Sequence, residues 1–168
     1  MATSSINRTG PTPITMSLAS LPSSGSFILG RESTEIDETT NKYLNAMVEG
    51  FVTTGAVAPT INTYLKLYAW ASHTAPSATP LDVITGLDAQ RTFTSGDIQN
   101  SILKLVRSVK VSATVNQKYH FSPFTIADIF GEMPAYWGLF LANGTGQILS
   151  ATGTDHEFKY TGIKFDSV

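Results

Sequence analysis

Residues 62–72 alternate between two sets of side chains with a period of two. The sets are Leu65, Leu67 and Ala69 on one side, and Tyr64, Lys66, Tyr68 and Trp70 on the other. This is the period of a β-strand, whose successive side chains point to opposite faces of a sheet. If the aliphatic side chains point inward, the other four form an exposed row of the kind that marks an interface. The alternative is that the aromatic face is core and the leucines pack elsewhere.

Other segments also have the pattern of short strands. Residues 43–52 alternate, with Ala46 and Val48 on one face, and Gly50 predicts a bulge. Residues 134–165 predict three strands, with a type I′ hairpin turn at Asn143-Gly144 between the first two. In the third strand we expect a shift of register at Gly162. Together these segments predict an all-β protein.

Two segments have apolar residues at helical spacing. Residues 98–111 keep helical spacing at first, but β-branched residues dominate their end, and we predict a strand there. Residues 125–130 follow Pro123 and precede Gly131, with apolar residues three and four positions apart. These signals predict one short helix at about 125–130.

The first 26 residues are rich in Ser, Thr, Pro and Gly and contain a single charge, Arg8. This composition predicts an extended N-terminal arm (1–26) followed by a single domain (27–168). The arm is expected either to fold back on its own domain or to lie across a neighbouring subunit. In the second case its apolar residues are the interface candidates, together with Tyr64, Lys66, Tyr68 and Trp70: Ile14, Met16, Leu18 and Leu21.

Composition narrows the classes of function. Charged residues make up 14% of the chain, against about a quarter in typical domains, which favours a protein packed against others. The net charge of −2 provides no basic surface for nucleic acid. The chain contains no cysteine, and therefore no disulfide or thiolate site. It has no apolar run long enough for a membrane span, and its N-terminus lacks the pattern of a signal peptide.

Candidate chemistry is sparse. His73, His120 and His156 lie far apart, without the spacing of metal ligands, and we interpret them as surface or half-buried residues. The acidic segment 32–38 is interpreted as solvated, because its spacing does not match a calcium loop. Trp70, and less so Trp137, are candidates for stacking on a sugar. We therefore expect no catalytic residues and no cofactor.

Three pieces of the chain resemble small structural proteins of tailed bacteriophages: GRESTEIDETTNKYLNAMVEG (30–50), FSPFTIADIFGEMPAYWGLFLANGTGQILSATG (121–153) and HEFKYTGI (156–163). The resemblance implies a virion protein, a head-decoration or cement protein with a jelly-roll fold. The expected fold is a jelly-roll-like β-sandwich of about eight short strands with one short helix and the arm.

The resemblance also implies the partners and the location. The expected partners are the major capsid protein and neighbouring copies in a dimer or trimer, without nucleic acid or membrane. The expected location is the capsid surface, after synthesis in the bacterial cytoplasm. The alternatives are a tail or head–tail connector component, and a carbohydrate-binding module of a fibre or spike.

Overall fold

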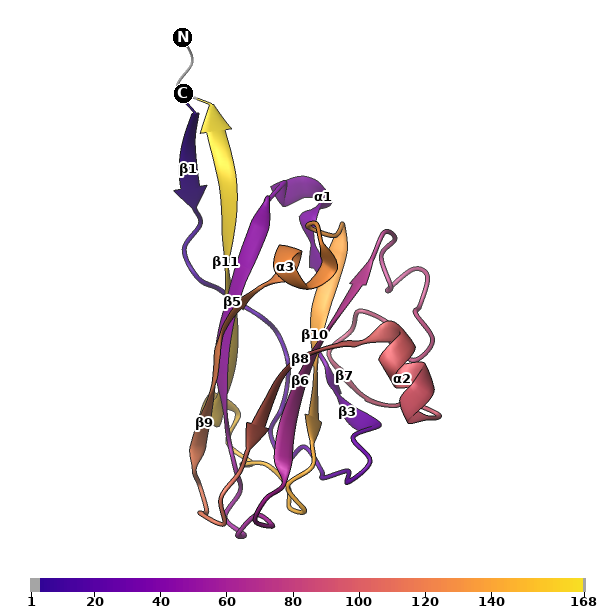
Figure 1. The fold of residues 1–168 in the computed structure, drawn as a ribbon, viewed down its shortest axis with the longest axis vertical. Coiled ribbons are helices and arrows are strands. Elements are labelled where there is room, and N and C mark those ends of the chain that lie inside the picture. Colours follow the sequence, from indigo (N-terminus) through magenta and orange to yellow (C-terminus); the bar gives the residue numbers. More distant parts are fainter. Residues whose placement is uncertain (1–3, 168) are drawn as a thin grey trace.

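Two antiparallel β-sheets pack face to face in the computed structural model, which describes residues 4–167 (Figure 1). Sheet A has the order β1-β11-β5-β9, and β2 also pairs with β11. Sheet B has the order β7-β3-β10-β6-β8, and β4 also pairs with β10. The strands of sheet A are β1 (Ser4–Arg8), β2 (Thr12–Pro13), β5 (Asn45–Thr53), β9 (Lys118–Thr125) and β11 (His156–Ser167). The strands of sheet B are β3 (Leu29–Glu32), β4 (Ile36–Asp37), β6 (Tyr64–Ser72), β7 (Ala89–Thr92), β8 (Lys104–Lys110) and β10 (Tyr136–Asn143).

The chain repeatedly crosses from one sheet to the other. It passes from β4 in sheet B to β5 in sheet A and back to β6, and later from β8 to β9, β10 and β11 in alternate sheets. Such crossings give the jelly-roll-like sandwich that the sequence predicts. The structure has more strands than the predicted eight because the arm contributes β1 and β2, and because β4 is a separate two-residue strand.

The described residues contain more helix than predicted. The helices are α1 (Glu38–Asn41), α2 (Gly96–Ile102), α3 (Ile126–Phe130) and the 3₁₀ helix η1 (Gly153–Asp155). Helix α3 confirms the predicted helix and ends at Gly131, whose φ of 87° suits glycine. The strand predicted over 98–111 is wrong in its first half, where α2 begins after Ser95, whose side chain accepts a hydrogen bond from the Ile98 amide.

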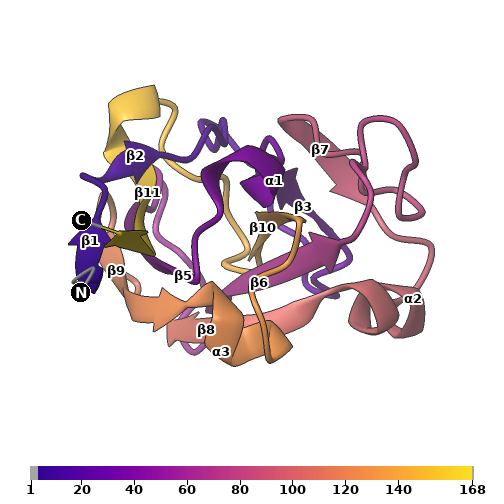
Figure 2. The ribbon, with the colours of Figure 1, turned by 90° about the horizontal axis from the view of Figure 1, so that it is seen from above.

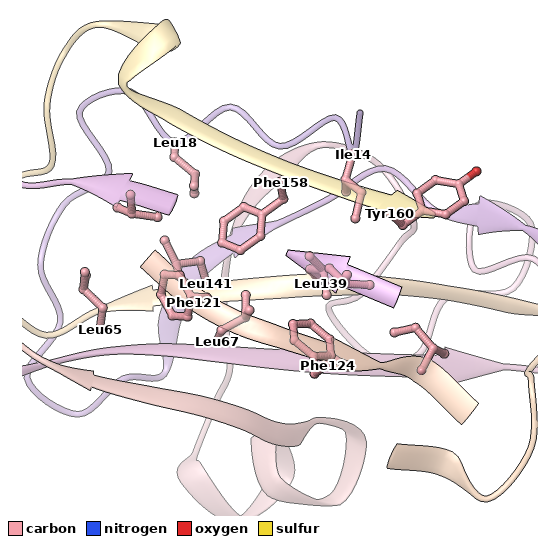
Figure 3. Close-up of a cluster of buried hydrophobic side chains, with 14 of the residues drawn as sticks. Ile14, Leu18, Leu65, Leu67, Phe121, Phe124, Leu139, Leu141, Phe158 and Tyr160 are labelled. Carbon is pink, nitrogen blue, oxygen red and sulfur yellow. The ribbon is translucent and has the colours of Figure 1, made fainter. Parts of the chain in front are cut away.

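The main core lies between the two sheets (Figure 3). Leu65, Leu67, Leu139 and Leu141 of sheet B are completely buried there. Sheet A contributes aromatic rings, among them Phe121, Phe124, Phe158 and Tyr160. The aliphatic face of β6 is therefore part of the main core, one of the two arrangements that the alternation allows.

A second core lies on the opposite face of sheet B. Tyr68, Trp70 and Phe140 point to this side and are covered by Phe93 and Leu103, which flank α2. Seen from above, α2 and β7 lie at the end of the molecule away from β1 and β11 (Figure 2). Both faces of β6 and β10 are thus buried, although sheets of this kind often leave one face to solvent.

The turn after β10 is not the predicted type I′ hairpin. Asn143 is the last residue of β10, and the positive φ of this loop is at Gly146 (79°). Strand β10 pairs with β3, β4 and β6, while Leu149 forms an isolated bridge with Thr54. The strand predicted for 147–149 is therefore wrong.

The two predicted irregularities of sheet A have different outcomes. The bulge at Gly50 is confirmed by a register shift between Val48 and Gly50 where β5 pairs with β9. The shift predicted at Gly162 is absent where β11 pairs with β5, which keeps one register from His156 to Ile163, but the register of β11 with the arm changes by one residue between Ile163 and Tyr160. Gly162 instead lies against the ring of Tyr43, and a Cβ there would come within 2.4 Å of it.

Candidate functional site

The N-terminal arm folds back on its own domain. Ile14, Leu18 and Leu21 are 6%, 2% and 3% exposed and belong to the main core (Figure 3). Met16 is partly buried against the same core. The backbone of the arm is also bonded to the domain, since the amide of Ile14 donates to the carbonyl of Phe158 at 2.8 Å. The prediction that these four side chains form an intermolecular contact is therefore wrong, because they fill the core of their own chain.

The predicted row on β6 is also largely internal. Tyr68 and Trp70 are 4% and 0% exposed in the second core, so their assignment to an interface is wrong. Tyr64 is 38% exposed, and the ammonium of the partly exposed Lys66 lies 3.9 Å from the centre of the Phe27 ring. Only Tyr64 and Lys66, at the start of the row, therefore reach the surface.

Neither tryptophan offers a platform for a sugar. Trp70 and Trp137 are both 0% exposed. Stacking on a sugar needs an accessible ring face, so the interpretation of these two residues as sugar-binding is wrong.

The acidic segment 32–38 is not uniformly solvated, contrary to the prediction. Glu32 is completely buried and accepts hydrogen bonds from Nε of Arg91 at 2.8 Å and from the amide of Thr85 at 3.0 Å. Glu38 is buried and accepts a bond from Nε1 of Trp137 at 3.2 Å. Burial raises the pKa of Glu38, because desolvation disfavours the charged carboxylate. Through these hydrogen bonds, both acids hold the segment between β3 and α1 against sheet B.

One histidine has a structural role. His156 is 9% exposed, its Nε2 lies 3.0 Å from the carbonyl of Ser150, and its Nδ1 accepts from the amide of Thr53. These partners require a neutral ring protonated at Nε2. Burial lowers the pKa of His156, in agreement with that form. His73 and His120 are exposed, and within 4–167 no three His, Asp or Glu side chains gather as metal ligands.

An open groove of about 520 Å³ lies on the outer face of sheet A, beside the bulge at Gly50. Phe51 and His120 line it, with ring centres 5.7 Å apart. Glu157 and Lys159 form an ion pair of 2.9 Å there, with side chains 42% and 35% exposed. Such a solvated pair is typical of a protein surface and differs from the desolvated acids and bases of catalytic sites.

A more distinctive surface lies at the end of the sandwich opposite the chain termini (Figure 1). We call it the loop end, and it consists of the loops 54–63, 111–117 and 144–152. None of the residues in these loops is charged. The exposed large aliphatic side chains are Val57 (57%), Ile61 (64%), Val115 (42%) and Ile148 (51%). Depletion of charge around exposed apolar side chains is the composition of an interface core.

Buried polar side chains hold these loops in place. Asn143, 0% exposed, donates to the carbonyls of Leu21 and Gln147 at 3.0 and 2.7 Å, and its Oδ1 accepts from the amide of Thr145 at 3.0 Å. Thr54 accepts from the amide of Gln117 at 3.0 Å. The loops also bond to one another, from Asn116 to Gly55 and from Thr60 to Thr145. The aliphatic side chains are therefore presented on an ordered framework, which reduces the entropic cost of binding.

Sequence reasoning missed the loop end, although a signal was present. Loops at a solvated surface are normally polar and often charged, whereas each of these three is uncharged and carries isolated Val or Ile. Only the fold shows that loops so distant in sequence lie together.

A second exposed apolar feature lies at the other end of the molecule. Strand β1 pairs with the last residues of β11, and this two-stranded ribbon extends beyond the body of the sandwich (Figure 1). We call it the terminal ribbon, residues 4–8 and 163–167. Ile6 and Phe165 are directly opposite each other in its register and are 66% and 60% exposed. Directly opposed residues share a face of a sheet, so these two side chains form an apolar pair open to solvent.

In comparisons with known proteins, no family model, no curated protein and no solved structure matches the chain. Across residues 4–167, no helix is long and apolar enough to span a bilayer.

Proposed function

We propose that the chain is a non-enzymatic structural protein of a bacteriophage virion, a head-decoration protein that binds the outer capsid lattice and reinforces it. Its partners are the major capsid protein and neighbouring copies of itself, and its location is the capsid surface. The observation that carries the proposal is the loop end, an ordered, uncharged surface with exposed Val57, Ile61, Val115 and Ile148. The resemblance of residues 30–50, 121–153 and 156–163 to phage structural proteins supports the class of virion protein.

The size of the loop end suits attachment to a repeating lattice. If its four aliphatic side chains bury ~300 Å² of apolar surface, the gross gain is ~7 kcal/mol at ~25 cal/mol per Å². Association itself costs roughly 4–15 kcal/mol, so one such contact is weak. Several weak contacts on a lattice become effectively intramolecular and together bind firmly.

The test is binding to expanded, empty heads that lack this protein. We expect saturable binding by co-sedimentation and a higher melting temperature of the heads by calorimetry. Ile61→Ser and Ile148→Ser should each weaken binding roughly tenfold or more, since a buried Ile contributes ~1.5–3 kcal/mol. The matched control is Leu87→Ser, because Leu87 is 56% exposed but lies outside the three loops.

The outcomes separate the alternatives. Heads that neither bind the protein nor melt higher overturn the decoration role, and binding to tails or connectors instead favours those locations. Unchanged head binding by the Ile61→Ser, Ile148→Ser double variant overturns the assignment to the loop end.

A further inference from the structure

The outer edge of β1 is open, and it lacks the features that protect the edge strands β8 and β9. Strand β1 is the last in sheet A, with no strand on its other side within the described chain. The edge strand β8 carries Lys104, Arg107 and Lys110, and the edge strand β9 carries Lys118 and Pro123. Lysine and proline on edge strands oppose pairing with other chains. Strand β1, with the sequence SSINR, contains neither.

The backbone direction shows which groups of β1 are available. The amide of Thr9 donates to the carbonyl of Gly162 in β11 at 3.0 Å. Since backbone N–H and C=O groups alternate sides along a strand, those of Arg8, Ile6 and Ser4 point away from β11. The open edge therefore presents three consecutive sets of donor and acceptor, centred on Ile6.

We propose that this edge pairs with the β1 edge of a second copy of the chain, in an antiparallel dimer with its two-fold axis at Ile6. This proposal concerns the terminal ribbon and is independent of capsid binding. Centred on Ile6, the register places Ile6 opposite Ile6, Ser5 opposite Asn7 and Ser4 opposite Arg8. The outward groups of Ser4, Ile6 and Arg8 then meet their counterparts, as an antiparallel ladder requires.

The side chains agree with this register. Because Phe165 is opposite Ile6 within each ribbon, the dimer aligns one row of four apolar side chains, Phe165, Ile6, Ile6 and Phe165, across one face. Arg8 lies opposite the uncharged Ser4, so no like charges are opposed. The edge is thus complementary to itself, as a two-fold interface must be.

The shape of the molecule permits the contact. The ribbon extends beyond the body, so that two bodies can lie on opposite sides of the joined ribbons (Figure 1). Pairing converts a two-stranded ribbon, which is marginal in water, into a four-stranded one. The five paired residues span only ~17 Å of strand. A contact of this length buries less than the ~1,000 Å² that is typical of a stable interface. We therefore expect a weak, concentration-dependent dimer.

Cysteine cross-linking tests the register, because the chain has no cysteine of its own. In the proposed dimer, the two copies of Ile6→Cys lie in a directly opposed pair with Cα atoms ~5.5 Å apart, within disulfide range. The matched control is Phe165→Cys, similarly exposed on the same ribbon but separated from its symmetry mate by three strand spacings, ~14 Å. Under mild oxidation we expect Ile6→Cys to cross-link roughly tenfold or more faster than Phe165→Cys.

A mixing experiment adds a second test of the same register. Ser5→Cys and Asn7→Cys should each cross-link poorly alone and readily when mixed, because residue 5 faces residue 7 of the other copy. Sedimentation equilibrium of the unaltered protein should show a reversible monomer–dimer equilibrium. Equal cross-linking rates for Ile6→Cys and Phe165→Cys, no gain on mixing, or a strictly monomeric chain at high concentration would each overturn the proposal. Dimers that Ile61→Ser abolishes would place the contact at the loop end instead and also overturn it.

Discussion

Replacing Asn143 with alanine should destabilise the protein and loosen the loop end. The amide side chain is completely buried and bonds to Leu21, Thr145 and Gln147 at distances of 2.7 to 3.0 Å. Alanine removes these partners from two carbonyls, one amide and the hydroxyl of Thr145. At ~1 kcal/mol of net stability for each bond and more for buried groups left unpaired, we expect a loss of ~2–4 kcal/mol.

The measurement is urea unfolding, combined with hydrogen exchange of the loop amides. The midpoint should fall with little change in slope, and the amides of Thr145 and Gly146 should lose protection. Asn100→Ala on the exposed side of α2 is the control and should change stability by less than ~0.5 kcal/mol. A loss below ~1 kcal/mol for Asn143→Ala, with protection unchanged, would refute the reasoning that this residue orders the loop.

The remaining predictions concern pH. Because burial lowers the pKa of His156 below its ordinary 6.5, its stabilising contribution is complete above pH 6.5 and is lost as the pH falls below that value. Thermal unfolding from pH 7.5 to 5 should show this loss in the unaltered protein and in His120→Gln, but less of it in His156→Gln; equal slopes in all three would contradict it. Because burial raises the pKa of Glu38 above its ordinary 4.5, stability should decrease as the pH rises from about 4.5 through the folded-state pKa. Glu38→Gln keeps an acceptor for Trp137 and should remove that decrease; a variant that retains it would exclude Glu38 as its source.

Alternation along β6 was sufficient to predict a strand, but it could not show what covers each face. A period of two divides side chains between faces without indicating which face is solvated. Trp70 is buried because residues before and after β7, among them Ile84, Phe93 and Leu103, cover the outer face of sheet B. A row of large aromatic side chains is compatible with an interface and with a core, and the sequence alone does not decide between them.

The wrong predictions of a strand at the start of 98–111 and of a solvated acidic segment at 32–38 have a related cause. Ser95 caps α2, and Gln99 of that helix donates to the carbonyl of Phe27 at 2.8 Å, so a tertiary contact stabilises a helix that β propensity disfavours. Glu32 is buried because Arg91 lies beside it, although the two are 59 positions apart. A partner at that distance leaves no local pattern, so an acidic segment appears solvated until the sheet order is known.

The position of the proposed interaction surfaces also depends on contacts between distant parts of the chain. Ile14, Leu18 and Leu21 of the arm close the core between the sheets, as their burial shows, so they are not available for partners. Of the large apolar side chains left exposed, the topology gathers four in the uncharged loops of the loop end and two, Ile6 and Phe165, on the terminal ribbon, while others such as Leu87 and Leu105 lie elsewhere. Next to the ribbon, Thr9 bonds to Gly162, which is 153 positions away, and no local feature of either segment indicates that pairing. Low charge predicts that this chain has surface to bury, but only the fold shows where its exposed apolar side chains lie together.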